Sequence, residues 1–99
     1  MRDLELDGNT STPSVSFHFE SGQLELSGES YPENSFDFYR PLLDWVRKFL
    51  ETSSVAVRLK IGLTYMNTSS IKSMMDLLDL LEDAHGTGRE VTVTWYYEE

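Results

Sequence analysis

The hydrophobic pattern predicts a β-hairpin near the amino terminus. Apolar and polar side chains alternate strictly over residues 14–19, and residues 24–26 repeat this period after a short turn. Gly22 can take the positive φ angle that a tight hairpin turn requires. The first twelve residues are polar and unpatterned, and Pro13 follows them, so we expect an extended lead-in to the first strand.

A wide apolar stripe at helical spacing follows the hairpin. Its members are Phe36, Tyr39, Leu43, Val46 and Leu50, broadened by Phe38, Leu42, Trp45 and Phe49. Asn34 or Ser35 can cap the start of this helix. Pro41 lies inside the stripe and lacks the amide hydrogen that an internal helix position donates. We therefore expect either a bend at Pro41 or a helix that begins near it.

The second half of the chain predicts a strand, a helix and a last strand. Residues 55–65 alternate between apolar and polar positions, which is typical of a strand. After a polar break at 66–70, apolar residues return with a helical period and run to Gly86, a natural helix C-cap. They are Ile71, Met74, Met75, Leu78 and Leu81. Residues 89–97 alternate again and predict the final strand.

These elements predict an α/β fold with a mixed four-stranded sheet. A hairpin is followed by two strand–helix–strand steps, and each step favours a parallel pair with a right-handed crossover. Two helices suffice to cover only one face of such a sheet. The other face then shows Arg58, Lys60, Thr92, Thr94 and Tyr96. A chain of 99 residues has room for one domain, so we assign residues 1–99 to a single domain.

Composition and charge narrow the classes of partner. The 8 basic and 17 acidic side chains give a formal net charge of -9, which repels nucleic acid and anionic membrane surfaces. The chain has no cysteine, which excludes disulfides, thiolate metal sites and cysteine nucleophiles. No apolar run resembles a secretory signal or is long enough to span a bilayer, so we expect a soluble, cytoplasmic protein.

The acidic residues form no recognisable catalytic pair. Those on the polar face of the predicted second helix are explained by solvation alone; they are Asp76, Asp79, Glu82 and Asp83. His18 and His85 lie on different elements and belong to no metal-ligand spacing. We predict no catalytic residue, no metal site and no cofactor, and keep a small acid–base enzyme as the alternative of another class.

One polar segment is harder to explain as structure alone. Asn67, Thr68, Ser69 and Ser70 lie between the carboxyl end of the 55–65 strand and the next helix, where open α/β sheets place functional sites. The start of a helix stabilises a phosphate through its unpaired N–H groups, and Lys72 adds a nearby positive charge. The segment is therefore a candidate phosphoacceptor. The alternative is that Ser69 or Ser70 caps the helix and the rest forms a turn.

Two segments together resemble the SiaC family of bacterial regulatory phosphoproteins. They are Ser30-Tyr31-Pro32-Glu33-Asn34-Ser35 and Tyr65-Met66-Asn67-Thr68-Ser69-Ser70-Ile71-Lys72-Ser73-Met74-Met75-Asp76, with the lead-in Thr10-Ser11-Thr12-Pro13. The similarity extends over nearly the whole chain in the same order. It implies a fold related to STAS domains, the class that includes anti-sigma-factor antagonists.

The resemblance also implies a function. The family's phosphorylated threonine corresponds to Thr68; a dedicated kinase adds the phosphate, and a metal-dependent serine/threonine phosphatase removes it. The bare protein binds and activates a diguanylate cyclase, which raises cyclic-di-GMP and favours biofilm formation. An anti-sigma-factor antagonist acting on a transcriptional partner is the alternative within the same class. The phosphate acts either by clashing with the partner or by docking on its own helix and reshaping the loop, and the sequence leaves both open.

A second loop is expected at the same edge of the sheet. Its residues Tyr31, Pro32, Glu33 and Asn34 follow the second predicted strand, and the alternative for them is a turn with a helix cap. Together with Asn67, Ser69, Ser70 and Lys72, they are our candidate contacts for a partner protein.

The chain departs from the family pattern at its end. Members continue beyond the strand that contains Trp95 and Tyr97, whereas this sequence stops at Glu99, as either a naturally short member or a shortened chain. In a shortened chain this strand loses cover, and the exposed apolar surface favours a homodimer.

Overall fold

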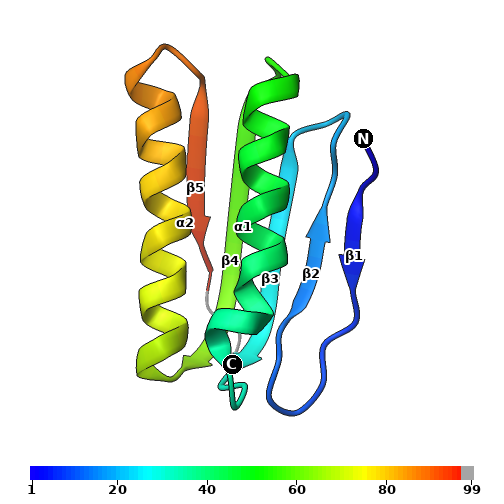
Figure 1. The fold of residues 1–99 in the computed structure, drawn as a ribbon, viewed down its shortest axis with the longest axis vertical. Coiled ribbons are helices and arrows are strands. Elements are labelled where there is room, and N and C mark those ends of the chain that lie inside the picture. Colours follow the sequence, from blue (N-terminus) through cyan, green and yellow to red (C-terminus); the bar gives the residue numbers. More distant parts are fainter. Residues whose placement is uncertain (97–99) are drawn as a thin grey trace.

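The structure is a computed structural model in which residues 1–96 are described, and it contains one mixed sheet and two helices (Figure 1). The elements are β1 (Leu4–Leu6), β2 (Ser14–Phe17), β3 (Gln23–Ser30), α1 (Ser35–Thr52), β4 (Val57–Met66), α2 (Thr68–Gly86) and β5 (Val91–Trp95). The five strands lie in the order β1-β2-β3-β4-β5. The pairs β1·β2 and β2·β3 are antiparallel, whereas β3·β4 and β4·β5 are parallel.

Both helices cover the same face of the sheet, as predicted (Figure 1). The core between the two layers consists of alternating strand residues and one stripe from each helix. From the strands come Val15, Phe17, Leu24, Leu26, Val57, Leu59 and Ile61, and from the helices Tyr39, Leu42, Val46, Phe49, Met74, Leu77 and Leu81, each at most 2% exposed. The predicted hairpin is confirmed, and Gly22 has the positive φ of 73° that its turn requires.

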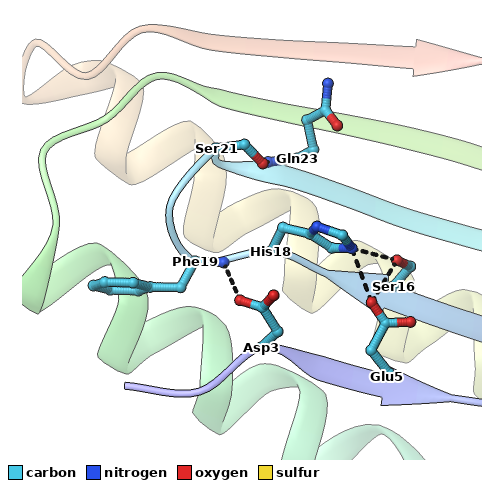
Figure 2. Close-up of polar contacts among 7 residues, drawn as sticks. All are labelled: Asp3, Glu5, Ser16, His18, Phe19, Ser21 and Gln23. Atoms are coloured by element: carbon cyan, nitrogen blue, oxygen red, sulfur yellow. Dashed lines mark hydrogen bonds and ion pairs between the residues drawn. The ribbon is translucent and has the colours of Figure 1, made fainter.

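The predicted count of four strands is wrong, because residues 4–6 form an additional edge strand. β1 pairs with β2 through Leu4 opposite Phe17 and Leu6 opposite Val15. Two hydrogen bonds of the residues just before β1 hold the strand there. Asp3 accepts a 2.8 Å hydrogen bond from the Phe19 amide (Figure 2), and the indole of Trp45 donates to the Arg2 carbonyl. A three-residue strand is too short to show a period in the sequence, so only these tertiary contacts reveal it.

Helix α1 begins at Ser35, so the alternative start near Pro41 is wrong. Asn34 is the N-cap residue, and its side-chain oxygen accepts a 3.1 Å hydrogen bond from the Asp37 amide. This cap satisfies one of the free amides of the first turn. Pro41 is an internal residue of a helix that continues to Thr52.

Helix α2 begins three residues earlier than the pattern predicted, and its buried face overlaps the predicted stripe only in part, through Met74, Leu78 and Leu81. Its buried residues are Ser70, Ser73, Met74, Leu77 and Leu81, whereas the predicted Ile71 and Met75 are 44% and 57% exposed. Ser70 and Ser73 occupy core positions despite their hydroxyls, so the apolar period alone pointed to a stripe about one residue away. The C-cap is Thr87 rather than Gly86, and Gly88 has the positive φ of 103°.

The face of the sheet opposite the helices carries polar side chains, as predicted. Arg58, Lys60, Thr92 and Thr94 are exposed. Tyr96 lies across this face, since its hydroxyl donates a 2.8 Å hydrogen bond to Glu25, and a Cβ on Gly62 would come within 2.2 Å of its ring. The last strand is shorter than expected, and Tyr97 lies outside the described residues.

Candidate functional site

The carboxyl ends of β3 and β4 meet the starts of both helices at one edge of the molecule, at the bottom of Figure 1. The backbone joins the two loops there, because the Asn67 amide donates a 3.0 Å hydrogen bond to the carbonyl of Ser30. Residues 30–35 and 65–72, which are far apart in the sequence, therefore form one surface.

Asn67 is the N-cap of α2, so the alternative in which Ser69 or Ser70 caps this helix is wrong. Its side-chain oxygen accepts a 2.9 Å hydrogen bond from the Ser70 amide, and its carbonyl accepts from the Ile71 amide. An amide side chain reaches back to the third residue of a helix as well as a hydroxyl does. Thr68 is consequently the first residue of the helix.

The three hydroxyls that follow Asn67 have different environments. The Thr68 side chain is exposed and, within residues 1–96, has no hydrogen-bond partner. Ser69 is exposed as well, but its Oγ donates to Ser35 Oγ at 2.9 Å and lies 3.3 Å from Asn67 Oδ1. Ser70 is completely buried. Thr68 is thus the hydroxyl of this segment that another protein can reach without breaking a hydrogen bond.

A chain of buried hydroxyls lies beneath this surface. Tyr39 Oη is 2.6 Å from Ser30 Oγ, which donates to Ser70 Oγ at 2.9 Å, and Ser70 Oγ is 3.1 Å from Ser35 Oγ. Burial raises the pKa of Tyr39, although its hydrogen bonds to Ser30 and Ser70 oppose that change, so the phenol keeps its proton. The chain satisfies these buried polar groups and ties the start of α1 to the start of α2.

Ser30, Ser35 and Tyr39 were not among the predicted site residues. Ser35 had appeared only as a helix cap and Tyr39 only as a core aromatic. The one signal in the sequence is that serines occupy the last position of β3 and the first position of α1. Their hydroxyls need a partner when buried, and the pattern does not say which.

An aromatic pair joins the two loops. Tyr65 lies three residues before Thr68, and Tyr31 is the first residue after β3. The rings of Tyr31 and Tyr65 meet edge to face with centroids 5.8 Å apart, and the two side chains are 39% and 55% exposed. Glu33 and Asn34 are exposed in the same loop, but Pro32 is buried. Pro32 therefore shapes the loop from within, while Tyr31, Glu33 and Asn34 remain available to a partner.

A family model for the SiaC family regulatory phosphoproteins matches residues 6–99. The chain belongs to this family. The solved structure of apo-SiaC from Pseudomonas aeruginosa is 46% identical, with a TM-score of 0.96 over 99% of this chain and 81% of that one. A curated relative, an uncharacterized protein of Pseudomonas aeruginosa strain UCBPP-PA14, is 46% identical over 99% of this chain and 78% of its own length.

A second solved structure concerns a complex. It holds the diguanylate cyclase SiaD together with its activator SiaC from Pseudomonas aeruginosa, and it matches 96% of this chain and 78% of that one. The TM-score is 0.93 and the identity 46%. The SiaC-family chain described here thus has the same fold as a protein that binds and activates a diguanylate cyclase.

Lys72 of this SiaC-family protein lies one turn into α2. Its ammonium makes a 2.6 Å ion pair with Asp76, and this hydrogen bond raises the pKa of the lysine. The pair lies on the surface, with side chains 73% and 41% exposed, and spans one turn of a single helix, the geometry of an ordinary surface pair. The charge of Lys72 is shared with Asp76 before any partner approaches.

The structure also brings a serine, a histidine and a glutamate together, which the sequence analysis did not foresee. Figure 2 shows Ser16 and Glu5 both in contact with Nε2 of His18, each at 2.8 Å. A catalytic triad needs the acid on one ring nitrogen and the nucleophile on the other. The cluster instead holds the edge strand β1 against β2. It does not argue against a regulatory function for a SiaC-family protein.

The remaining acidic residues show no arrangement typical of an enzyme. Asp79, Glu82 and Asp83 are exposed along α2, and Asp76 is partly buried and paired with Lys72. Among residues 1–96, no three histidine, cysteine, aspartate or glutamate side chains gather so as to hold a metal ion. The matching family is described as regulatory phosphoproteins.

Proposed function

We propose that this SiaC-family protein is a binding protein switched by phosphorylation of Thr68. The bare form binds and activates a diguanylate cyclase, a protein kinase adds the phosphate, and a metal-dependent serine/threonine phosphatase removes it. The observation that carries the proposal is the Thr68 hydroxyl, exposed and without a hydrogen-bond partner in residues 1–96, at the start of a helix beside two loops. The cyclase complex of a 46% identical relative supports a diguanylate cyclase as the partner, over the alternative in which this protein is an anti-sigma-factor antagonist with a transcriptional partner.

The partner surface that we propose consists of exposed residues around Thr68 together with the partly buried Asn67. From the β3–α1 loop it includes Tyr31, Glu33 and Asn34, and from the second loop Asn67, Ser69 and Lys72. Tyr65 joins the set, because its ring packs on Tyr31 and is half exposed. Pro32 and Ser70 are buried and shape these loops from within.

The phosphate acts, in this proposal, by obstructing the partner rather than by reshaping the loop. A phosphate on Thr68 adds about 1.5 to 2 negative charges to this surface. On its own helix the phosphate would find the Ser70 amide already bonded to the Asn67 side chain and the Ile71 amide to the Asn67 carbonyl, which leaves it only the amides of Thr68 and Ser69. The phosphate therefore extends toward solvent, where a partner surface that fits the bare hydroxyl cannot accommodate it.

Binding of the two forms to a diguanylate cyclase tests this function. We expect phosphorylation of Thr68 to weaken binding about 100-fold or more, the size typical of a charge buried without a partner in an interface. Biolayer interferometry with the bare and the fully phosphorylated protein measures the ratio. Equal affinities of the two forms for the cyclase would contradict the switch, and no binding by either form would contradict the choice of partner.

The proposed partners work on nucleoside triphosphates, so we place the protein in the cytoplasm. A kinase and a diguanylate cyclase both consume such substrates, which are kept inside the cell. Neither α1 nor α2 is long and apolar enough to cross a membrane.

We also propose that the fold is related to STAS domains, and this proposal is based on the resemblance alone.

We further propose that the chain of residues 1–99 pairs with a second copy through β5. Within residues 1–96, β5 pairs along one edge, with β4, and on its helix side Val93 and Trp95 are 38% and 53% exposed. Strands with free edges and apolar side chains invite pairing. Sedimentation velocity should show a dimer fraction that rises with protein concentration and with salt, since salt screens the net charge of -9 on each copy. A monomer at every concentration and ionic strength contradicts the pairing.

A further inference from the structure

The loop before α2 presents two exposed hydroxyls side by side, those of Thr68 and Ser69. A kinase that reaches the first also comes within reach of the second. Their hydrogen bonding differs, however, because within residues 1–96 the Thr68 hydroxyl has no partner, whereas Ser69 Oγ donates to Ser35 Oγ at 2.9 Å.

We propose that Ser35 determines which of the two hydroxyls is phosphorylated, by holding the proton of Ser69 against the start of α1. This inference rests on the proposed function, since it concerns the same phosphorylation site. It makes Ser35 a specificity-determining residue, although Ser35 is only 2% exposed and cannot itself contact a kinase to any useful extent.

Transfer of the phosphoryl group requires the hydroxyl to give up its proton. The oxygen of the acceptor forms a bond to the γ-phosphorus of a nucleoside triphosphate, the bond from that phosphorus to the bridging oxygen breaks, and the nucleoside diphosphate leaves. The hydroxyl proton passes to a base of the kinase. The proton of Ser69 points at Ser35, inside the protein, where no base of another molecule can take it, while Thr68 has no such constraint.

The position of Ser35 is itself held from below. Its Oγ lies 3.1 Å from Ser70 Oγ, and Ser70 is completely buried and accepts a hydrogen bond from Ser30. If the Ser35 side chain turned away, the Ser70 hydroxyl would lose a partner in the interior, which is costly. Asn67 Oδ1 is the other acceptor for Ser69, at 3.3 Å, but it already accepts the Ser70 amide at 2.9 Å. Ser69 therefore makes its shorter hydrogen bond to Ser35, and the Ser35 side chain is itself held in place.

Site-resolved phosphorylation of a small set of variants tests the proposal. A kinase that phosphorylates the wild-type chain, with ATP, is incubated with wild type, Thr68→Ala and Thr68→Ala/Ser35→Ala, and the phosphate is located by tandem mass spectrometry. We expect phosphate on Thr68 in wild type and almost none on Ser69 in Thr68→Ala. The double variant should carry about ten times more phosphate on Ser69, the factor that one lost hydrogen bond represents.

Two further proteins complete the design. Thr68→Ala/Ser35→Thr keeps the hydroxyl and should return Ser69 to the low level of Thr68→Ala, whereas Thr68→Ala/Ser35→Gly removes the hydroxyl and guards against a folding defect particular to alanine. Phosphate on Ser69 while Ser35 is intact overturns the role of Ser35, as does an unmodified Ser69 in both hydroxyl-lacking double variants when Thr68 of wild type is modified. Absence of phosphate from Thr68 in wild type overturns the proposed function as well.

Discussion

The Thr68→Ala protein is expected to take up no phosphate from a kinase that fully modifies the wild-type chain. The substitution removes the one hydroxyl of the Asn67–Ser70 segment that is both exposed and unpartnered within residues 1–96. Ser69 and Ser70 do not replace it, because the first donates to Ser35 and the second is completely buried. Intact-mass measurement after incubation with ATP distinguishes a modified from an unmodified chain, and the expected change is complete loss.

The control for this experiment keeps the hydroxyl but changes the residue. Thr68→Ser should still be phosphorylated, since the oxygen stays at the same first position of α2. Neither substitution removes the cap, which Asn67 supplies, so the free energy of unfolding should change by less than about 0.5 kcal/mol. A Thr68→Ala chain that gains the mass of one phosphate at the wild-type rate would disprove Thr68 as the acceptor.

The largest loss of stability is expected from Gly22→Ala, in the turn between β2 and β3. Gly22 has a φ of +73°, which costs an alanine about 1 to 2 kcal/mol. The added Cβ would also lie 2.1 Å from the carbonyl oxygen of Ala56, and that atom belongs to the backbone and cannot turn away. The Gly22 carbonyl accepts the Arg58 amide at 2.9 Å, so a shift of the turn would also disturb the start of β4.

Together these effects should lower the free energy of unfolding by about 3 kcal/mol or more. For a chain of this size, that corresponds to a fall in melting temperature of roughly 10 to 20 °C. Thermal unfolding followed by circular dichroism measures it, and urea unfolding supplies the free energy directly.

Two other glycines serve as matched controls for that measurement. Gly88 has a φ of +103° but no atom within 4 Å of an added Cβ, so Gly88→Ala should show the conformational cost alone. Gly86 lies in α2 with open space around it, and alanine there should be neutral or stabilising by up to about 1 kcal/mol. If Gly22→Ala were no worse than Gly88→Ala, the close approach of Gly22 to Ala56 would not matter to stability.

The local elements could be predicted because their signals lie close together in the chain. Alternation over residues 14–19 and 55–65, the Gly22 turn and the two apolar periods all depend on neighbours within a few residues. The parallel crossovers, the single helical layer and the position of the Asn67–Ser70 segment at the sheet edge followed from that order. The Asn67–Ser70 segment could therefore be singled out from chain order, whereas Thr68 within it was indicated only by the resemblance to the SiaC family.

The errors came where the sequence offers a choice that only packing resolves. β1 has three residues and is held by Asp3 and by the Trp45 indole, contacts that span at least 16 positions of the chain. Helix α2 buries Ser70 and Ser73 and leaves Ile71 and Met75 exposed. Burial of Ser70 is possible because its hydroxyl forms hydrogen bonds with Ser30 and Ser35. A pattern that counts apolar residues assigns both serines to the surface.

The sequence alone thus determined the kind of fold and the segment that carries the proposed acceptor, because both depend on local periods and on chain order. The tertiary structure decided which hydroxyl is available. Thr68, Ser69 and Ser70 are alike in chemistry and adjacent in the chain, and they differ because residues about 35 to 40 positions away lie beneath two of them. A buried hydroxyl must pair with whatever the fold brings to it, and Thr68, at the outer side of the helix start, is given no partner within residues 1–96.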